Sequence, residues 1–283
     1  MQKFGSAWTQ TKLDVLEKYL ASYIKIMKNQ SFKLFYIDAF SGSGNIKIKD
    51  GTEIDGSAIR SLKYPFDYYY FFDLDKANCD SLNTIIENHY SNKKEKITVK
   101  NTDCNEMLQK ISEKDWLKNN WRGVIFLDPY AMQLSWESLE NISKTKAIDV
   151  WYFFPFYALN RNLQTKGIIP ASSKKAISKL LGTDTWKEVI YKESAQFSLF
   201  EESSLEKINT DELREYIIKR LRETFPAVSD KAVLLNNEKN APIFLLCFAG
   251  SNPSEKAVKA SLKVANHLLS NIGGERDGVK IKN

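Results

Sequence analysis

Acidic residues stand at or just after the ends of four apolar runs in this chain. They are Asp38, Asp73, Asp75, Asp103 and Asp128. An apolar run that ends in a polar residue is typical of a buried parallel strand. Parallel strands present their carboxyl ends at one edge of a sheet, where ligands bind, so we expect these side chains to line one crevice. Their carboxylates would accept hydrogen bonds from ammonium, hydroxyl or amino groups.

The segment DAFSGSG, residues 38–44, contains Gly42 and Gly44, which allow a backbone to approach a ligand closely. A P-loop for nucleoside triphosphates needs a Gly-Lys-Ser/Thr ending, which GSGNIK lacks. A dinucleotide fingerprint needs a third glycine where this chain has Lys47, and an acid about 20 residues further on, whereas Asp73 is more distant. A pyrophosphate ligand is therefore disfavoured, and a nicotinamide enzyme is the weaker alternative.

S-adenosylmethionine has no phosphate and fits the same segments better. Asp38 is placed to accept a hydrogen bond from its ammonium group, and Asp73 or Asp75 to accept from the ribose hydroxyls. An acceptor for the adenine amino group is available at Asp103. The predicted cofactor-binding residues are Asp38, Phe40, Gly42, Gly44, Asp73, Asp75, Asp103 and Cys104. The competing interpretation is that acids at strand ends only cap helices or shape turns.

The run GVIFLDPY, residues 123–130, ends in a candidate catalytic group made of Asp128, Pro129 and Tyr130. The proline biases Asp128 to extended backbone and stops strand pairing, which directs the carboxylate and the aromatic ring to the mouth of the sheet. There Asp128 is expected to orient an amine and to help remove its proton. The competing interpretation is a strand-ending Asp-Pro followed by a core tyrosine.

Strands that alternate with helices must position these groups. The apolar runs predict strands at 33–38, 67–75, 97–101, 123–130 and 148–155, followed by two more strands within 233–250. Helical spacing predicts a helix from Leu13 to Met27 before the first strand, and Ser57 and Ser135 are predicted to cap later helices. This alternation predicts an α/β fold with a mostly parallel sheet covered on both faces.

The alternation stops after Pro155 and indicates a division of the chain. We predict a core with its N-terminal helix at 1–155, a mainly helical insertion at 156–225, strands and a helix that complete the core at 226–275, and a tail at 276–283. The insertion contains one candidate strand at 196–200. Its basic residues are predicted to line the crevice and to grip a polyanion: Lys174, Lys175, Lys179, Arg214, Arg220 and Arg222.

Taken together, these motifs resemble the three-cysteine-motif partner family, the TcmP-like proteins. The resemblance runs from about Thr9 to Leu163 and rests on YIDAFSGSG, the Gly56-Ser57 after that loop, FFDLD, FLDPY, IDVWYFFP and the Arg161-Asn162-Leu163 that follows. It implies a Rossmann-like class I methyltransferase fold, with a mostly parallel seven-stranded sheet and an antiparallel C-terminal strand. It also implies a partner protein that carries the three cysteines of the family name and resembles radical-SAM enzymes.

The resulting functional prediction is a methyltransferase that uses S-adenosylmethionine on an amino group of a nucleobase, in nucleic acid or in a nucleotide. Amino-directed nucleic-acid methyltransferases carry a similar Asp/Asn-Pro-Pro-Tyr/Phe motif, although here the second proline is absent and Tyr130 comes one position early. Arg161 and Asn162 are the candidate substrate-binding residues, because an arginine there can pair with a phosphate or a carboxylate. The alternative is a non-catalytic scaffold that binds the three-cysteine protein or nucleic acid.

Composition limits the other classes of function. The net charge of +6 and the pI near 8.9 suit a polyanionic partner, but they also fit a compositional bias toward lysine. The three cysteines have no Cys-x-x-Cys spacing and the chain has only two histidines, so neither disulfides nor a metal site is expected. No apolar run approaches the roughly 18 residues of a membrane span, and a cytoplasmic location is expected.

Overall fold

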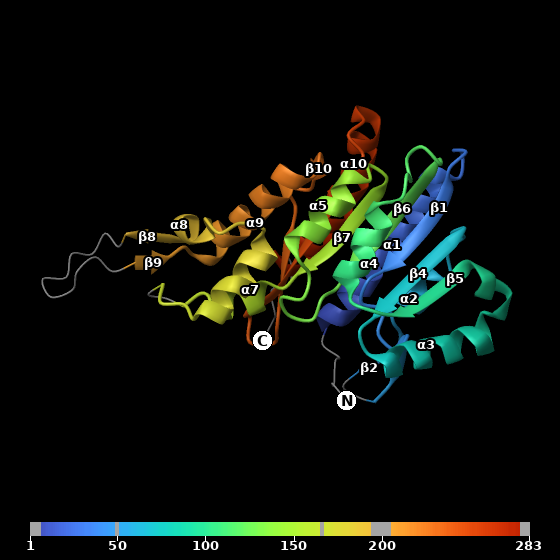
Figure 1. The fold of residues 1–283 in the computed structure, drawn as a ribbon, viewed down its shortest axis with the longest axis horizontal. Coiled ribbons are helices and arrows are strands. Elements are labelled where there is room, and N and C mark those ends of the chain that lie inside the picture. The colour runs from blue at the N-terminus through green and yellow to red at the C-terminus, as the bar shows by residue number, and fades with distance from the viewer. Residues whose placement is uncertain (1–6, 49–50, 165–166, 194–204, 278–283) are drawn as a thin grey trace, which may run out of the picture.

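A central β-sheet organises the protein in the computed structural model, which describes residues 7–48, 51–164, 167–193 and 205–277 (Figure 1). Its strands are β1 (Lys33–Asp38), β4 (Tyr68–Asp73), β5 (Ile97–Asn101), β6 (Trp121–Leu127), β7 (Ile148–Phe154), β10 (Ala227–Val228), β11 (Val233–Asn236) and β12 (Pro242–Gly250). The order across the sheet is β10-β12-β7-β6-β1-β4-β5, and β11 also pairs with β12. The five strands from β5 to β7 are parallel, as the alternation of strands and helices predicts.

The C-terminal part of the sheet differs from the expected seven strands, because the described sheet has eight. Strand β12 runs antiparallel to β7, which confirms the predicted direction. It is nine residues long, so its outer edge has room for two short antiparallel partners, β11 along its first half and β10 along its second. The extra strand is thus a consequence of the length of β12.

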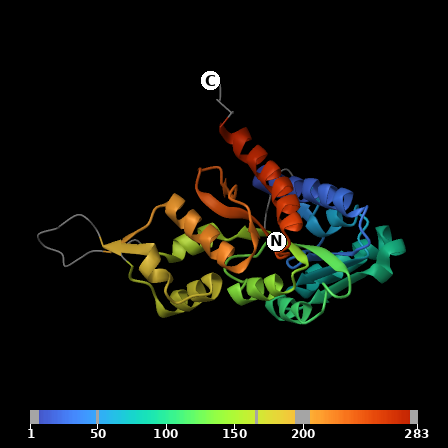
Figure 2. The ribbon, with the colours of Figure 1, turned by 90° about the horizontal axis from the view of Figure 1, so that it is seen from above.

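Helices cover both faces of this sheet. They are α1 (Ala7–Met27), α2 (Ser57–Ser61), α3 (Lys76–His89), α4 (Cys104–Ser112), α5 (Trp136–Lys144), α6 (Phe156–Asn162), α7 (Ala171–Leu181), α8 (Trp186–Ile190), α9 (Thr210–Thr224) and α10 (Glu255–Asp277), with a 3-10 turn, η1 (Ser91–Lys96). Alternate strand residues enter two core clusters, so Phe35 packs under α4 and α5 whereas Tyr36 packs under α1 and α2. Figure 2 shows α1 and α10 on one side of the sheet and α4, α5 and α7 on the other.

The predicted elements agree with the structure wherever long apolar runs define them. The strands at 33–38 and 97–101 have the predicted bounds, whereas 67–75 shortens to Tyr68–Asp73. The predicted Ser57 cap is wrong: the N-cap is Gly56, without a side-chain hydrogen bond, and Ser57 begins the helix. The segment before it also forms an unpredicted hairpin, β2 (Asn45–Lys47) with β3 (Glu53–Asp55).

The segment after β7 is mainly helical but is not separate from the core. Helix α9 contributes Leu213, Ile217 and Leu221 to the cluster that also contains residues of β7. A short hairpin, β8 (Tyr191–Glu193) with β9 (Leu205–Lys207), extends from this part of the molecule (Figure 1). The candidate strand at 196–200 lies outside the described residues. Helix α10 extends to Asp277, so the predicted boundary at 275 falls within a helix.

Among the described residues, no helix is both long enough and apolar enough to cross a membrane.

Candidate functional site

The strand order creates a crevice beside β1. The chain proceeds from β1 to β4 and β5 on one side, then returns to β6 and β7 on the other. Ligands of open α/β sheets bind beyond the carboxyl ends of the strands at such a reversal. Asp38 ends β1 and is in register with Phe126, so Asp128 lies just beyond it on the neighbouring strand. The two predicted acids therefore flank the reversal.

The glycine loop after β1 has the backbone that the sequence predicts for close approach. Gly42 and Gly44 have φ of +59° and +90°, a region that side chains disfavour. The Gly42 N–H donates to Asp73 Oδ2 at 2.9 Å, which joins the loop to the end of β4. A Cβ added at Gly42 would meet no atom within 4 Å, whereas one at Gly44 would contact Leu82 at 3.0 Å. Gly42 thus borders open space, and Gly44 packs against α3.

Asp38 is fully buried at the centre of this arrangement. Its Oδ1 accepts from the Phe40 N–H at 3.3 Å, and its Oδ2 has no hydrogen-bond partner among the described residues. Burial raises the pKa of Asp38 to about 7; a hydrogen bond from Ser57 opposes this shift, and the charges of Asp128 and Asp73 add to it. A buried carboxylate oxygen without a donor is costly, so a cationic ligand would relieve a real deficit.

Gly56 packs tightly on the glycine loop and thereby places Ser57, the next residue, near Asp38. The Gly56 N–H donates to the Gly44 carbonyl oxygen at 2.7 Å, and a Cβ at Gly56 would stand 2.8 Å from that oxygen. Any larger residue at position 56 would push α2 away from the loop. The Gly-Ser pair therefore fixes the start of α2 against Asp38, a role different from the predicted helix cap.

The two acids at the end of β4, Asp73 and Asp75, have different surroundings. Asp73 Oδ1 accepts from the Asp75 N–H at 2.8 Å and from Asn78, while its Oδ2 holds the glycine loop. Asp75 is the N-cap of α3, and its Oδ1 accepts from the Ala77 N–H at 2.8 Å. Between them Leu74 is 66% exposed, an unusual position for a large apolar side chain next to a sheet edge. Asp73 is the acid joined to the loop, and Leu74 supplies an apolar surface beside it.

Asp103 and Cys104 begin α4. Asp103 is its N-cap and accepts from the backbone and the side chain of Asn105. The Asn105 amide also donates to the Gln133 carbonyl oxygen at 3.0 Å, so Asn105 joins the end of β5 to the loop after β6. The Cys104 thiol is buried in the core, and this burial raises its pKa to about 12. Cys104 therefore contributes to the packing of the core in this structure.

Asp128 forms an ion pair that the sequence analysis did not predict. Its Oδ2 is bonded to the Lys12 ammonium of α1, and Lys12 is only 8% exposed. The same ammonium lies 5.6 Å from the centre of the Phe153 ring. Lys12 stands one turn before Val15 and Leu16 on the buried face of α1, a position where the helical pattern calls for an apolar residue. A lysine at this apolar position is the sequence signal from which a buried partner for Lys12 could have been predicted.

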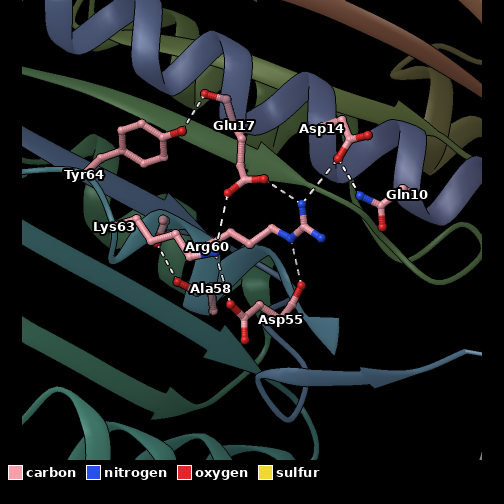
Figure 3. A network of polar contacts seen from close by, with 9 residues as sticks. Gln10, Asp14, Glu17, Asp55, Ala58, Arg60, Lys63 and Tyr64 are labelled. Carbon is pink, nitrogen blue, oxygen red and sulfur yellow. Dashed lines mark hydrogen bonds and ion pairs between the residues drawn. The ribbon is translucent and has the colours of Figure 1, made fainter. Parts of the chain in front are cut away.

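Helix α1 is held over the site by Arg60 of α2 (Figure 3). The Arg60 guanidinium donates to Glu17 at 2.6 Å, to Asp14 at 3.4 Å and to the Asp55 carbonyl oxygen at 2.9 Å. Tyr64 adds a hydrogen bond from its hydroxyl to the Glu17 carbonyl oxygen. Arg60 is buried, and a buried arginine needs such partners. The network fixes the position of α1, and with it Lys12, relative to the glycine loop and α2.

The loop after Asp128 presents an aromatic ring to solvent. Pro129 is buried, whereas Tyr130 is 62% exposed, which does not fit the alternative of a core tyrosine. The Tyr130 N–H donates to the Gln133 side-chain oxygen at 3.1 Å, and Ala131 has a φ of +56°. The turn thus keeps the ring outside the core, beside Asp128.

The candidate substrate residues on α6 differ in their surroundings. Arg161 is exposed, whereas the Asn162 amide donates to the Ala158 carbonyl oxygen and accepts from the Ser173 hydroxyl. Two of the basic residues assigned to the insertion serve the fold. Arg214 donates to the Ala232 and Asp230 carbonyl oxygens, and Arg220 to the Leu181 carbonyl oxygen beside the Trp136 ring. These two guanidinium groups therefore have partners within the fold, and the prediction that they line the crevice stays a prediction.

The charged side chains of the sheet edge described above are the carboxylates of Asp38, Asp73, Asp75, Asp103 and Asp128, together with the Lys12 ammonium. In the part of the chain that the structure describes, no group of three or more histidine, cysteine or acidic residues is arranged to hold a metal ion. Sequence reasoning missed Lys12, Leu74 and Asn105, and it predicted Ser57 as a helix cap without predicting that it lies near Asp38.

No family model matches the chain, and no curated protein matches it. Among solved structures, a Legionella pneumophila protein of the family DUF519 is 15% identical with a TM-score of 0.48, covering 91% of this chain and 92% of that chain. A Klebsiella pneumoniae protein described as a putative O-methyltransferase is 10% identical with a TM-score of 0.44, covering 87% and 91%. Trm1 from Pyrococcus horikoshii, solved with S-adenosyl-L-methionine, is 14% identical with a TM-score of 0.37, covering 93% and 76%. Likeness at this level assigns neither cofactor nor substrate to the present chain.

Proposed function

We propose that this protein binds S-adenosylmethionine at the carboxyl edge of β1, β4 and β6 and transfers its methyl group to an amine. The observation that carries the proposal is the convergence of Asp38, Asp73 and Asp128 around a glycine loop that borders open space. Carboxylates around the loop disfavour a pyrophosphate cofactor there and attract a ligand that bears a sulfonium and an ammonium.

The residues present fit this cofactor. Asp38 has an unpartnered oxygen for the ammonium, and Gly42 leaves room beside the loop for the amino-acid part. Asp73 is the candidate acceptor for the ribose hydroxyls, and the exposed Leu74 offers an apolar surface to the adenine ring. Asp103 has one carboxylate oxygen engaged as a helix cap, which leaves the other as an acceptor for the adenine amino group.

Bound S-adenosylmethionine supplies an electrophilic methyl group, so the main task of the protein is to hold the nucleophile in line with it. Asp128 would accept a hydrogen bond from the attacking amine and take its proton after transfer. Lys12 fixes the orientation of that carboxylate through their ion pair. Tyr130 stands exposed beside Asp128, where it can stack on a flat acceptor.

A nucleobase amino group, in nucleic acid or in a nucleotide, is the acceptor that these residues favour. It combines a planar ring for Tyr130 with an N–H donor for Asp128, and Arg161 is exposed on α6 for a phosphate. Membership of the three-cysteine-motif partner family, with a radical-SAM-like partner, is the corresponding proposal from sequence resemblance. If the chain belongs to that family, the competing function is a scaffold that binds its partner and transfers no methyl group.

Two measurements test the proposed function. Isothermal titration should show binding of S-adenosylmethionine and no binding of NAD. Incubation with methyl-labelled S-adenosylmethionine and separate pools of RNA, DNA, nucleotides and protein should then label a pool that contains nucleobases. Cofactor binding without label in any pool would instead favour the scaffold. Binding of NAD alone would contradict the cofactor assignment.

Cofactor affinity should rise with pH in a way that reports Asp38. The pKa of Asp38 is about 7, so the carboxylate is mostly protonated at pH 5.5 and mostly ionised at pH 7.5. Only the ionised form attracts the ammonium, which keeps its own proton up to about pH 8. We expect the association constant to increase roughly 20-fold between these two pH values. Titration of Asp38→Asn, which stays neutral, should be weak and nearly independent of pH. An unchanged pH dependence in that variant would contradict the role of Asp38.

Conservative substitutions should distinguish the roles of the two acids at the end of β4. Asp73→Asn keeps the size of the side chain but removes the charge that receives the ribose hydroxyls, so S-adenosylmethionine should bind about 10- to 100-fold more weakly. Asp75→Asn keeps a good N-cap for α3 and is expected to change the affinity less than threefold. The reverse result would assign the ribose to Asp75. Unchanged binding in the double variant would remove the role from both.

A further inference from the structure

An aromatic pocket lies at the opposite end of β4 from the candidate site. Tyr68 and Asp73 are the first and last residues of this strand, which places them about 17 Å apart. The pocket has a volume of about 480 Å³ and is walled by Tyr68, Tyr70, Trp116 and Trp121. It is built from residues that take no part in the chemistry proposed above, so it calls for a separate explanation.

The rings in this pocket form a platform. Tyr68 and Tyr70 alternate on one face of β4, with ring centres 6.3 Å apart and planes within 20° of each other. Trp121 meets Tyr68 edge-on at 6.0 Å, and buried Trp116 stacks on Phe35 at 4.2 Å, which fixes the floor. Tyr68 is 41% exposed. Rigid, half-exposed rings of this kind offer flat apolar surface at a low entropy cost.

Two lysines border the platform. The Lys114 ammonium lies 5.5 Å from the Tyr70 ring centre and 5.2 Å from that of Trp116, and the Lys33 ammonium lies 5.5 Å from that of Trp121. Within the residues that the structure describes, neither ammonium pairs with a carboxylate. The positive charge at the rim is therefore available to an anion.

The other charged or amide side chains that line the pocket, Asn119 and Asp115, each have a partner close by in the chain. Asn119 donates its amide N–H to the Asp115 carbonyl oxygen at 2.9 Å, and the Asp115 carboxylate pairs with Lys118 at 3.3 Å. A sugar ligand needs free carboxylates and amides for its hydroxyls, whereas this rim offers ammonium groups. Aromatic rings with ammonium groups at their edge match unstacked bases joined by phosphates.

We propose that this pocket binds single-stranded nucleic acid, with a base stacked on Tyr68 and Tyr70 and the phosphates next to Lys114 and Lys33. A duplex would not serve, because its bases are already stacked on one another. The inference goes beyond the proposed methyl transfer, since binding at this surface needs neither cofactor nor turnover.

Fluorescence anisotropy with labelled ten-residue oligouridine and oligothymidine tests the proposal. Tyr68→Ala should weaken binding at least tenfold, because a stacked base is lost, whereas Tyr68→Phe keeps the ring and should bind within twofold of the parent. Lys114→Ala should weaken binding and reduce the slope of log affinity against log salt by about 0.7. Lys259→Ala removes an exposed charge from α10 and serves as the matched control, with binding like the parent.

Several results would overturn this proposal. One is the absence of oligonucleotide binding at low salt, and another is equal affinity of Tyr68→Ala and the parent. Equal affinity for an abasic oligomer would show that phosphates alone are bound, and binding of neutral oligosaccharides without oligonucleotides would make this a carbohydrate site. Melting curves establish that each variant is folded. Titration with S-adenosylmethionine reports separately on the proposed function, so the two proposals can fail independently.

Discussion

Asp128→Ala is expected to lower methyl transfer by a factor of about 10² or more while cofactor affinity changes little. This factor is typical of the loss of a positioned general acid or base. Asp38, the glycine loop and Asp73 would still hold the cofactor. The measurement is label transferred from S-adenosylmethionine to the acceptor pool, with cofactor affinity measured by titration on the same preparations. Equal labelling by the variant and the parent would eliminate a catalytic role for Asp128.

The ion pair with Lys12 requires a control, because Asp128→Ala leaves an ammonium without its partner. Breaking a buried pair typically costs roughly 3–5 kcal/mol, and the cost here should be smaller because the Asp128 side chain is 20% exposed. The double variant Lys12→Met with Asp128→Asn removes both charges. The double variant should be more stable than Asp128→Ala, but its methyl transfer should stay as low as that of Asp128→Ala. If turnover returned together with stability, the role of Asp128 would be structural.

Gly42→Val should abolish binding of S-adenosylmethionine, weakening it by at least about 100-fold, while the protein remains folded. A side chain at this position meets no protein atom within 4 Å, so the valine would occupy the space assigned to the ligand. Its backbone would also be strained by about 1–2 kcal/mol, since φ is +59°. Isothermal titration and a thermal melt together measure both effects.

Gly51→Val is the matched control for this strain. Gly51 has a φ of +88°, and a Cβ there also meets nothing within 4 Å, but it lies in the hairpin of β2 and β3. The two variants should melt at similarly lowered temperatures, and only Gly42→Val should lose the cofactor. Parental affinity in Gly42→Val would show that the loop does not hold the ligand.

The sequence predicted the buried strands and the acids at their ends. It did not predict features that depend on contacts between distant segments. The runs at 33–38 and 97–101 define their strands because each is bounded by polar residues, and the acids that follow reach the same edge. The hairpin of Asn45–Lys47 with Glu53–Asp55 went unpredicted because three-residue polar strands carry no periodic signal. The carbonyl partners of Arg214 and Arg220 also went unpredicted, since the charge of an arginine does not show whether it binds a backbone carbonyl.

The site itself was predicted in its acids but not in the residues that restrain them. Asp75 and Asp103 do cap helices, so the structural interpretation of these two residues is correct, and it leaves one oxygen of each available. Lys12 lies 116 positions before Asp128, a separation at which a single sequence carries no pairing information. Ser57 could be recognised as a helix start, but its contact with Asp38 depends on how closely Gly56 packs on Gly44.

The late position of β12 in the chain has a consequence for synthesis on the ribosome. Strand β7 ends at Phe154, and the strand that covers its open edge begins about 90 residues later, at Pro242. At the usual translation rate of about 5–20 residues per second, the edge of β7 stays unpaired for roughly 5–18 seconds before β12 begins to be synthesised. Its sequence IDVWYFF is strongly apolar, and an unpaired apolar edge readily recruits other chains. We expect the nascent protein to depend on chaperones in this interval, and slower translation between residues 155 and 241 to lower the yield of folded protein.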